Sequence, residues 1–183
     1  MSQRKRSICK LFRLIDFKYY DELLEDQGDN EKRKGYQKEF HIQMFGINEN
    51  GETCSIIVKD YKPFFYVKVS DDFDYSKLVS FERSLNSLRA KIDMVKHKKL
   101  YGFSGGKKFK FLKLEFENSS DFSRAKYLIS DKIKKKEFKN MEMYESNIPP
   151  LLRYFHINEV SPSGWISINT SKVLICNDKT TTC

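Results

Sequence analysis

The sequence lacks any run of apolar residues long enough to cross a membrane, which takes about 18 in succession. Basic residues stand at positions 4–6, but the apolar stretch that follows, residues 11–17, is interrupted by Arg13 and Asp16. That interruption makes it a poor secretory signal. We therefore predict an intracellular protein with no membrane partner.

Cysteine and histidine are also scarce, at four and three residues, and no Cys-x-x-Cys pair occurs. Their scatter gives no zinc-ligand spacing and no Ser-His-Asp arrangement. Gly105-Gly106 lacks the Lys-Ser/Thr that follows a phosphate-binding loop. Asp71 and Asp72 are adjacent, and side chains of adjacent residues diverge, so we interpret them as acids at a helix start. We expect no catalytic residue, no metal site and no cofactor in this chain.

What the sequence does have is positive charge and aromatic side chains. Its 34 Lys and Arg exceed 25 Asp and Glu, for a net charge of +9, and there are 15 Phe and 10 Tyr. This is enough bulky apolar surface for a core in 183 residues. The charge favours an anionic partner, nucleic acid first and an acidic membrane second, although a solvated lysine-rich surface explains it equally well.

Residues 1–62 predict strands. Residues 8–20 and the pair 41–47 and 52–59, which flank a turn-rich tetrad, have the composition of strands, the pair forming a hairpin. Residues 21–38 are charged and predict a loop or insert.

Residues 63–145 predict the order β-α-β-β-α-β, the ferredoxin-like order in which two helices cover one face of a four-stranded antiparallel sheet. The whole chain is therefore expected to be α+β. Strands are expected over 64–69, 94–103, 109–116 and 138–144, with a tight turn at 104–106. The first expected helix has Asp74 as N-cap and an apolar face of Leu78, Phe81, Leu85, Leu88 and Ile92. The second has Ser119 or Ser120 as N-cap and an apolar face of Phe122, Ala125, Leu128 or Ile129, and Ile133.

Residues 146–183 predict a connector. Asn147 is placed to cap a short third helix, in whose first turn Pro149 and Pro150 are tolerated because those amides lack intrahelical acceptors. A short strand is expected over 165–168.

The strand over 109–116 resembles part of the RNA-recognition signature, in which bases stack on aromatic side chains of an exposed sheet. Phe109 and Phe111 occupy the two stacking positions and point to one face because side chains alternate along a strand. Tyr66 is the best third aromatic. Packing of Phe109 and Phe111 beneath another segment is the alternative, and it is the reading we favour.

Eight lysines and one acid lie between Lys91 and Lys113, and they predict a surface that neutralises phosphates. A second lysine run, over 132–139, is interpreted as a solvated helix end. The candidate phosphate-binding lysines are Lys96, Lys98, Lys99, Lys107, Lys108 and Lys110.

One segment carries a family resemblance. The residues Tyr144-Glu145-Ser146-Asn147-Ile148-Pro149, then Leu152-Arg153-Tyr154-Phe155 and Gly164-Trp165-Ile166, are similar to the stretch of family B DNA polymerases that leads from the N-terminal domain into the 3′–5′ exonuclease domain. The positions that carry this motif, which we take as structural, are Tyr144, Glu145, Asn147, Pro149, Arg153 and Trp165.

Further segments fall in the family's order. Residues 40–46, 61–68, 100–103 and 111–114 resemble the delta-type branch and its large-DNA-virus relatives, and the likeness covers about residues 8–170. Pro150 replaces the usual Phe. The resemblance implies an OB-like part over 1–62, an RNA-recognition-like part over 63–145, and a connector that ends before the exonuclease motifs.

The resemblance also implies a role. Such a domain packs against the exonuclease domain and borders the single-stranded template. The family's Asp-Ile-Glu, Asp-Thr-Asp and Ser-Leu-Tyr-Pro motifs are absent here, so this chain alone should neither synthesise nor degrade DNA. The full protein would be a Mg²⁺-dependent DNA polymerase with proofreading. Its partners would be DNA, the downstream domains and, as a further candidate, a sliding clamp, in a host's cytoplasmic viral factory or nucleus.

Two other functions fit the residues. The first is a self-contained RNA-recognition-like module for single-stranded RNA or DNA. The second is a structural adaptor whose basic face meets an acidic protein.

Overall fold

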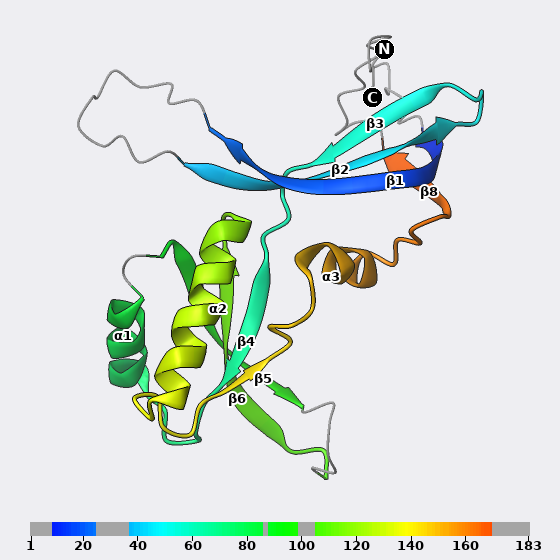
Figure 1. The fold of residues 1–183 in the computed structure, drawn as a ribbon. Helices are drawn as coiled ribbons and strands as arrows, with labels where there is room; N and C mark the ends of the chain where they lie inside the picture. Colours follow the sequence, from blue (N-terminus) through cyan, green and yellow to red (C-terminus); the bar gives the residue numbers. More distant parts are fainter. Residues whose placement is uncertain (1–8, 25–36, 86–87, 99–104, 170–183) are drawn as a thin grey trace, which may run out of the picture. The chain divides into compact units, whose positions relative to one another are not determined.

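The computed structural model describes residues 9–24, 37–85, 88–98 and 105–169 (Figure 1). Within these ranges the chain forms two antiparallel sheets and three helices, which confirms the α+β class. It divides into a first unit, Met1–Tyr20, His41–Tyr61 and Leu151–Cys183, and a second unit, Asp21–Phe40 and Lys62–Pro150. The elements are β1 Cys9–Leu23, β2 Lys38–Asn48, β3 Thr53–Val58, β4 Phe64–Lys68, α1 Tyr75–Ser84, β5 Ala90–Lys98, β6 Lys108–Phe116, α2 Ser119–Lys134, β7 Glu142–Tyr144, α3 Pro150–Ile157 and β8 Trp165–Asn169.

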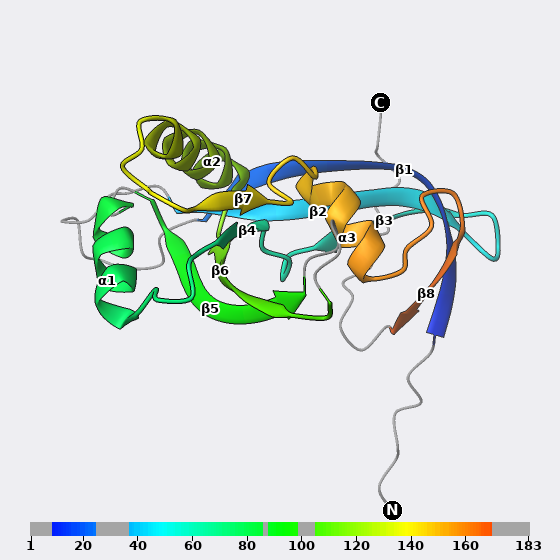
Figure 2. The same ribbon diagram turned by 90° about the horizontal axis from the view of Figure 1, so that it is seen from below.

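The second unit contains the expected order β-α-β-β-α-β, as β4-α1-β5-β6-α2-β7. Its strands form one sheet in the order β5-β6-β4-β7, in which each neighbouring pair is antiparallel. Helices α1 and α2 both cover one face of this sheet (Figures 1 and 2). The two central strands, β6 and β4, therefore have one face packed under helices and one face turned away from them.

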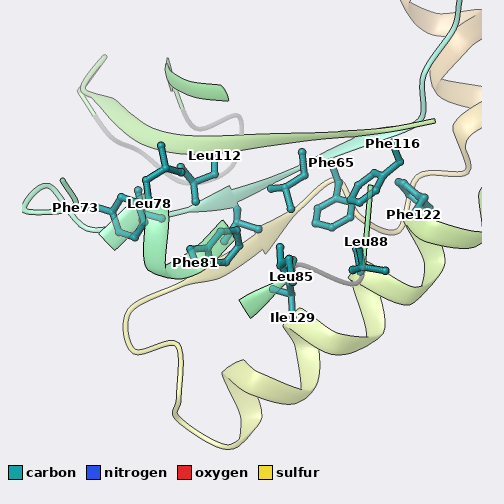
Figure 3. Packing of buried hydrophobic residues seen from close by; sticks show 14 residues of the cluster. Phe65, Phe73, Leu78, Phe81, Leu85, Leu88, Leu112, Phe116, Phe122 and Ile129 are labelled. Atoms are coloured by element: carbon teal, nitrogen blue, oxygen red, sulfur yellow. The ribbon is translucent and has the colours of Figure 1, made fainter. Parts of the chain in front are cut away.

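The core of the second unit forms where this sheet meets the helices (Figure 3). Alternate residues of β4 and β6 point into it, and the helices contribute residues spaced three or four apart, because those positions share one helix face. Phe65 stacks on Phe116 with ring centroids 5.5 Å apart, and Phe122 meets both rings edge-on. The fully buried members include Phe65, Val67, Leu85, Leu112, Leu114, Phe116 and Ile129.

Helix α1 begins as expected and ends earlier than expected. The Asp74 side chain accepts a hydrogen bond from the Lys77 amide, which confirms it as the N-cap. The helix ends at Ser84, however, so the prediction that Leu88 and Ile92 continue it was wrong. Leu88 is buried after the helix, and Ile92 lies in β5, opposite Leu114. Leu88 and Ile92 keep the apolar spacing of the helix because the connection and β5 bury residues in the same core as α1.

Helix α2 is capped by Asn118 and not by either serine. The Asn118 side chain accepts a hydrogen bond of 2.7 Å from the Asp121 amide, and Ser119 is the first helical residue. The strand expected over 138–144 is shorter, since β7 comprises only Glu142–Tyr144. Lys136 and Asn140 both have φ near 60°, a left-handed conformation that a strand does not accommodate.

The sheet of the first unit has the order β3-β2-β1-β8. The predicted hairpin is β2–β3, and β8 covers the strand expected at 165–168. Strand β1 continues to Leu23 and β2 starts at Lys38, so both ends of the expected 21–38 loop are strand; residues 25–36 lie outside the described residues. The buried residues of the first unit include Phe12, Leu14, Phe155, Ile42 and Met44.

Helix α3 begins at Pro150, so Asn147 lies in the preceding turn and is not the N-cap. Strand β5 ends at Lys98, and the remainder of the strand expected over 94–103 lies outside the described residues. At the turn that follows, Gly105 and Gly106 have φ of 56° and 76°. None of the helices described is long and apolar enough to cross a lipid bilayer.

Candidate nucleic-acid interface

The strand registers of the second unit decide which side chains share a face of its sheet. Phe64, Tyr66 and Lys68 of β4 lie opposite Glu115, Lys113 and Phe111 of β6. Side chains alternate, so these residues occupy the face away from α1 and α2, because Phe65, Val67, Leu112 and Leu114 point into the helix-covered core. We call this the aromatic face. Its other members are Lys91, Asp93, Val95 and His97 on β5, Phe109 on β6, and Glu142 and Tyr144 on β7.

Phe111 lies at the centre of the aromatic face. Its ring centroid is 5.3 Å from that of Tyr144, 6.2 Å from Tyr66 and 6.3 Å from His97. Tyr66 and His97 are themselves 5.5 Å apart. Only 4% of Phe111 is exposed, so a base could not stack on its ring without displacing a neighbour. This geometry agrees with the packing alternative for Phe111.

Phe109 has different surroundings. It is partly exposed, and the Nζ atoms of Lys68 and Lys107 lie 5.6 and 5.5 Å from its ring centroid. Both distances are within the range of a cation–π interaction. Of the three predicted stacking residues, Phe109 and Tyr66 therefore keep some accessible surface, and Phe111 does not.

The charges on the aromatic face largely cancel. The Lys91 Nζ lies 3.0 Å from an Asp93 carboxylate oxygen and 3.8 Å from one of Glu115, and Lys113 pairs with Glu115. The hydrogen bond to Asp93 raises the pKa of Lys91 above its ordinary value. Such pairs leave this part of the sheet with little net charge to attract a phosphate.

The predicted lysines lie elsewhere. Lys96 pairs in register with Lys110, and Lys98 with Lys108, which places all four on the face opposite Phe109 and Phe111. Lys110 donates to the carbonyl oxygens of Asp71 and Phe73, the latter at 3.2 Å, so it holds the connection between β4 and α1.

Lys107 precedes β6 and pairs with the Asp71 carboxylate at 3.4 Å, and Lys99 lies outside the described residues. The structure thus brings Tyr66, Phe109 and Phe111 together and separates them from Lys96, Lys98, Lys108 and Lys110.

Sequence reasoning missed three contributors to the aromatic face: His97, Lys68 and the ring of Tyr144. Lys68 and Tyr66 are two residues apart in one strand, so period-two alternation was the available signal for Lys68. His97 and Tyr144 required the register of β5 and β7, which no local pattern gives. The pKa of Tyr144 is raised, first by burial and then by the hydrogen bond its hydroxyl donates to Glu142 at 2.9 Å.

The family-motif residues fall on both units. Tyr144, Glu145, Asn147 and Pro149 belong to the second unit. Glu145 has φ of 58°, and its carbonyl accepts from the Ile148 amide at 3.3 Å, so the motif forms a turn between β7 and α3.

Arg153 and Trp165 belong to the first unit. Arg153 lies on α3 and is only 5% exposed, whereas Trp165 on β8 is 54% exposed beside Arg13. Burial raises the pKa of the nearby Tyr61 to about 12, and the Arg153 charge opposes that rise. The motif positions thus lie in a turn, on a helix and on a strand, and their structural role stays a prediction.

Within the described ranges, no group of three or more His, Cys, Asp or Glu side chains is arranged to hold a metal ion.

No family model matches the chain, but several known proteins are similar to it in sequence. It is 38% identical to a DNA polymerase of Phaeocystis pouchetii virus over 95% of this chain and 19% of that polymerase. It is 30% identical to a DNA polymerase of Pyramimonas orientalis virus, over 86% of this chain and 13% of that one. The DNA polymerase delta catalytic subunit of Schizosaccharomyces pombe is 29% identical over 72% of this chain and 13% of its own length.

A solved structure has the same fold. The family B DNA polymerase of Pyrobaculum calidifontis matches with a TM-score of 0.57 at 16% identity, over 85% of this chain and 17% of that one. The chain is therefore a homologue of viral and delta-type DNA polymerases. Its fold is that of the matched part of a family B DNA polymerase. It spans less than a fifth of the length of the first two viral polymerases.

Proposed function

We propose that the chain is the non-catalytic N-terminal part of a replicative family B DNA polymerase. In this role it supports the exonuclease domain and borders the single-stranded template, while other parts of the protein synthesise and proofread DNA. The observation that carries the proposal is the 38% identity to a viral DNA polymerase over 95% of this chain. The first unit would be the OB-like part, and the second the ferredoxin-like or RNA-recognition-like part.

A supporting role for another domain agrees with the surface of the first unit. Its strands β1 and β8 leave Leu11, Ile15 and Trp165 exposed, and α3 leaves Leu152 and Ile157 exposed. Large apolar side chains left exposed on one unit are typical of a protein part that another domain covers. Trp165 lies on the motif that, in the family, leads toward the exonuclease domain.

The remaining partners follow from the same proposal. DNA would be bound as template and primer-template by the whole enzyme, a sliding clamp is a candidate partner, and the site of action would be a cytoplasmic viral factory or the host nucleus. Mg²⁺ would serve the catalytic domains. The described part of this chain offers no carboxylate cluster for it.

The test starts from the native gene product. An antibody against this chain should detect, in cells that make it, a polypeptide several times heavier than 21.7 kDa, and that polypeptide should extend a primer when supplied with Mg²⁺ and deoxynucleotides. A native product of 21.7 kDa that restores no polymerase activity to any associated chain would refute the proposal.

A second candidate function is a self-contained module that binds single-stranded nucleic acid by stacking. Phe109 favours it, because this ring is partly exposed and flanked by Lys68 and Lys107. Stacking gives about 1–3 kcal/mol per base. Phe109→Ala should then weaken oligonucleotide binding about fivefold or more. Under the polymerase proposal the isolated chain binds weakly and the substitution changes little.

A further inference from the structure

We propose that the β5–β6 hairpin carries a binding site for the phosphodiester backbone of nucleic acid, formed by Lys96, Lys98 and Lys108. We call these three residues the lysine ladder. The inference rests on the proposed function in one respect, since it takes nucleic acid as the partner. It differs from a stacking site because the ladder lies on the face of the sheet opposite Phe109 and Phe111.

The first observation is the register. Lys98 lies directly opposite Lys108, and Lys96 directly opposite Lys110, so like charges face each other at two successive positions of one face. Directly opposed side chains in an antiparallel pair have Cβ atoms about 4.5–5.5 Å apart, and like charges there destabilise the pair. An anion bound between the two rows would relieve that repulsion.

The second observation is that the ladder has no counter-charge in the part of the chain that the structure describes. Lys96, Lys98 and Lys108 are exposed, and no described carboxylate forms an ion pair with any of them. Their neighbours Lys110 and Lys107 are already engaged, by carbonyl oxygens and by Asp71. Many lysines elsewhere in the same unit have acid partners, namely Lys62, Lys68, Lys77, Lys91, Lys113, Lys132 and Lys135.

The chemistry of the ladder indicates which anion it binds. Lysine is a flexible point charge that contacts phosphate without reading sequence. Residues two apart in a strand are about 6.7 Å apart, so Lys96 and Lys98 can meet separate charges of an extended polyanion. The aromatic side chains that β5 and β6 offer for stacking are on the other face. Binding at the ladder should therefore be independent of base sequence and strongly dependent on salt.

The test measures the salt dependence of binding. The whole 183-residue chain and the variant K96Q/K98Q/K108Q are titrated against a fluorescent oligothymidylate and a duplex, across a series of salt concentrations. Each neutralised phosphate contributes about 0.7 to the slope of log K against log salt for a single strand and about 0.9 for a duplex. The variant should lose about 2 from the single-strand slope, with weaker binding at low salt.

A matched variant controls for net charge. K126Q/K134Q/K139Q removes three lysines from α2 and the turn after it, and its slope should stay that of the unaltered chain. The melting temperature of the ladder variant should be unchanged or higher, because the opposed charges are gone. Lys98→Gln alone repeats the test with a single exposed substitution, and it should lower the single-strand slope by about 0.7.

Four results would contradict the lysine-ladder proposal. One is a slope that is equal in the ladder variant and the unaltered chain, and another is an equal loss in both triple variants. The third is displacement of the oligonucleotide by polyglutamate at equal charge, which would assign the ladder to an acidic protein. Absence of any oligonucleotide binding by the unaltered chain also removes the ladder, while the polymerase proposal is decided separately by primer extension.

Discussion

Replacing Asp21 by alanine should loosen the start of helix α2. One carboxylate oxygen of Asp21 accepts from the Ser119 amide at 2.8 Å, and the other accepts from the Ser120 amide at 3.2 Å and from both serine hydroxyls. Asn118 satisfies the Asp121 amide. The amides of Ser119, Ser120 and Asp121, which have no intrahelical acceptor, are thus all bound. Two of them are bound by Asp21, which lies 98 and 99 positions away in the sequence.

The size of the effect follows from these contacts. Loss of a cap typically costs about 1 kcal/mol, and a hydrogen bond to a charged group contributes about 1.5–3 kcal/mol. Asp21 is partly exposed, which reduces both effects. We expect Asp21→Ala to lower the free energy of unfolding by about 2 kcal/mol and Asp21→Asn, which keeps one acceptor, by about 1 kcal/mol. For a chain of this length the alanine variant should melt about 4–8 °C lower.

Urea unfolding followed by circular dichroism measures this loss, and amide hydrogen exchange at Ser119 and Ser120 locates it. Asp16→Ala is the matched control, because the Asp16 carboxylate accepts from the amide of its neighbour Phe17 at 2.8 Å in the same strand. It should change stability by less than about 0.5 kcal/mol. Equal stabilities for the Asp16 and Asp21 variants, or unchanged exchange at the two serines, would refute the argument.

Three further predictions follow from single contacts. Gly46→Ala should cost about 3 kcal/mol or more in urea unfolding, because its Cβ would lie 2.0 Å from the Arg13 carbonyl oxygen; a loss below 1 kcal/mol would contradict it. Lys98→Glu should raise the melting temperature by pairing with Lys108 and should weaken oligonucleotide binding; a lower melting temperature would argue against the register. Tyr61 has a pKa of about 12 in the folded protein against a value near 10 in the unfolded chain. The contribution of this shift to the free energy of unfolding is therefore complete below pH 10 and is lost as the pH rises toward 12. Tyr61→Phe should abolish that part of the decline in stability.

Local patterns in the sequence predicted the second unit well. Asp74 is the expected cap, and the alternation in β4 and β6 correctly assigned Phe109 and Phe111 to one face. The predicted end of a helix was wrong where the helix and the next strand bury residues in the same core. Leu88 and Ile92 continued the apolar period of α1, but the first follows the helix and the second is in β5.

Long-range contacts explain what remained hidden. Ser119 and Ser120 have the composition of caps, yet they donate to Asp21, whose position near α2 no window of sequence reveals. The aromatic face depends on the register of β5 and β7, which brings His97 and Tyr144 to the ring of Phe111. The family motif was visible in the sequence because its three pieces lie within one short stretch, residues 144–166.

The same alternation that placed the aromatics together also separates them from the lysines. In a strand that reads Lys108-Phe109-Lys110-Phe111, the lysines and phenylalanines must point to opposite faces. A nucleic acid that stacked on Phe109 could not, at the same residues, neutralise its phosphates with Lys108. The lysine and aromatic residues of this segment therefore do not form one binding surface. It supports either a stacking face of nearly balanced charge, on which Phe111 is already covered, or a charged face that contacts the backbone alone. The unpaired state of Lys96, Lys98 and Lys108 among the described residues favours the second.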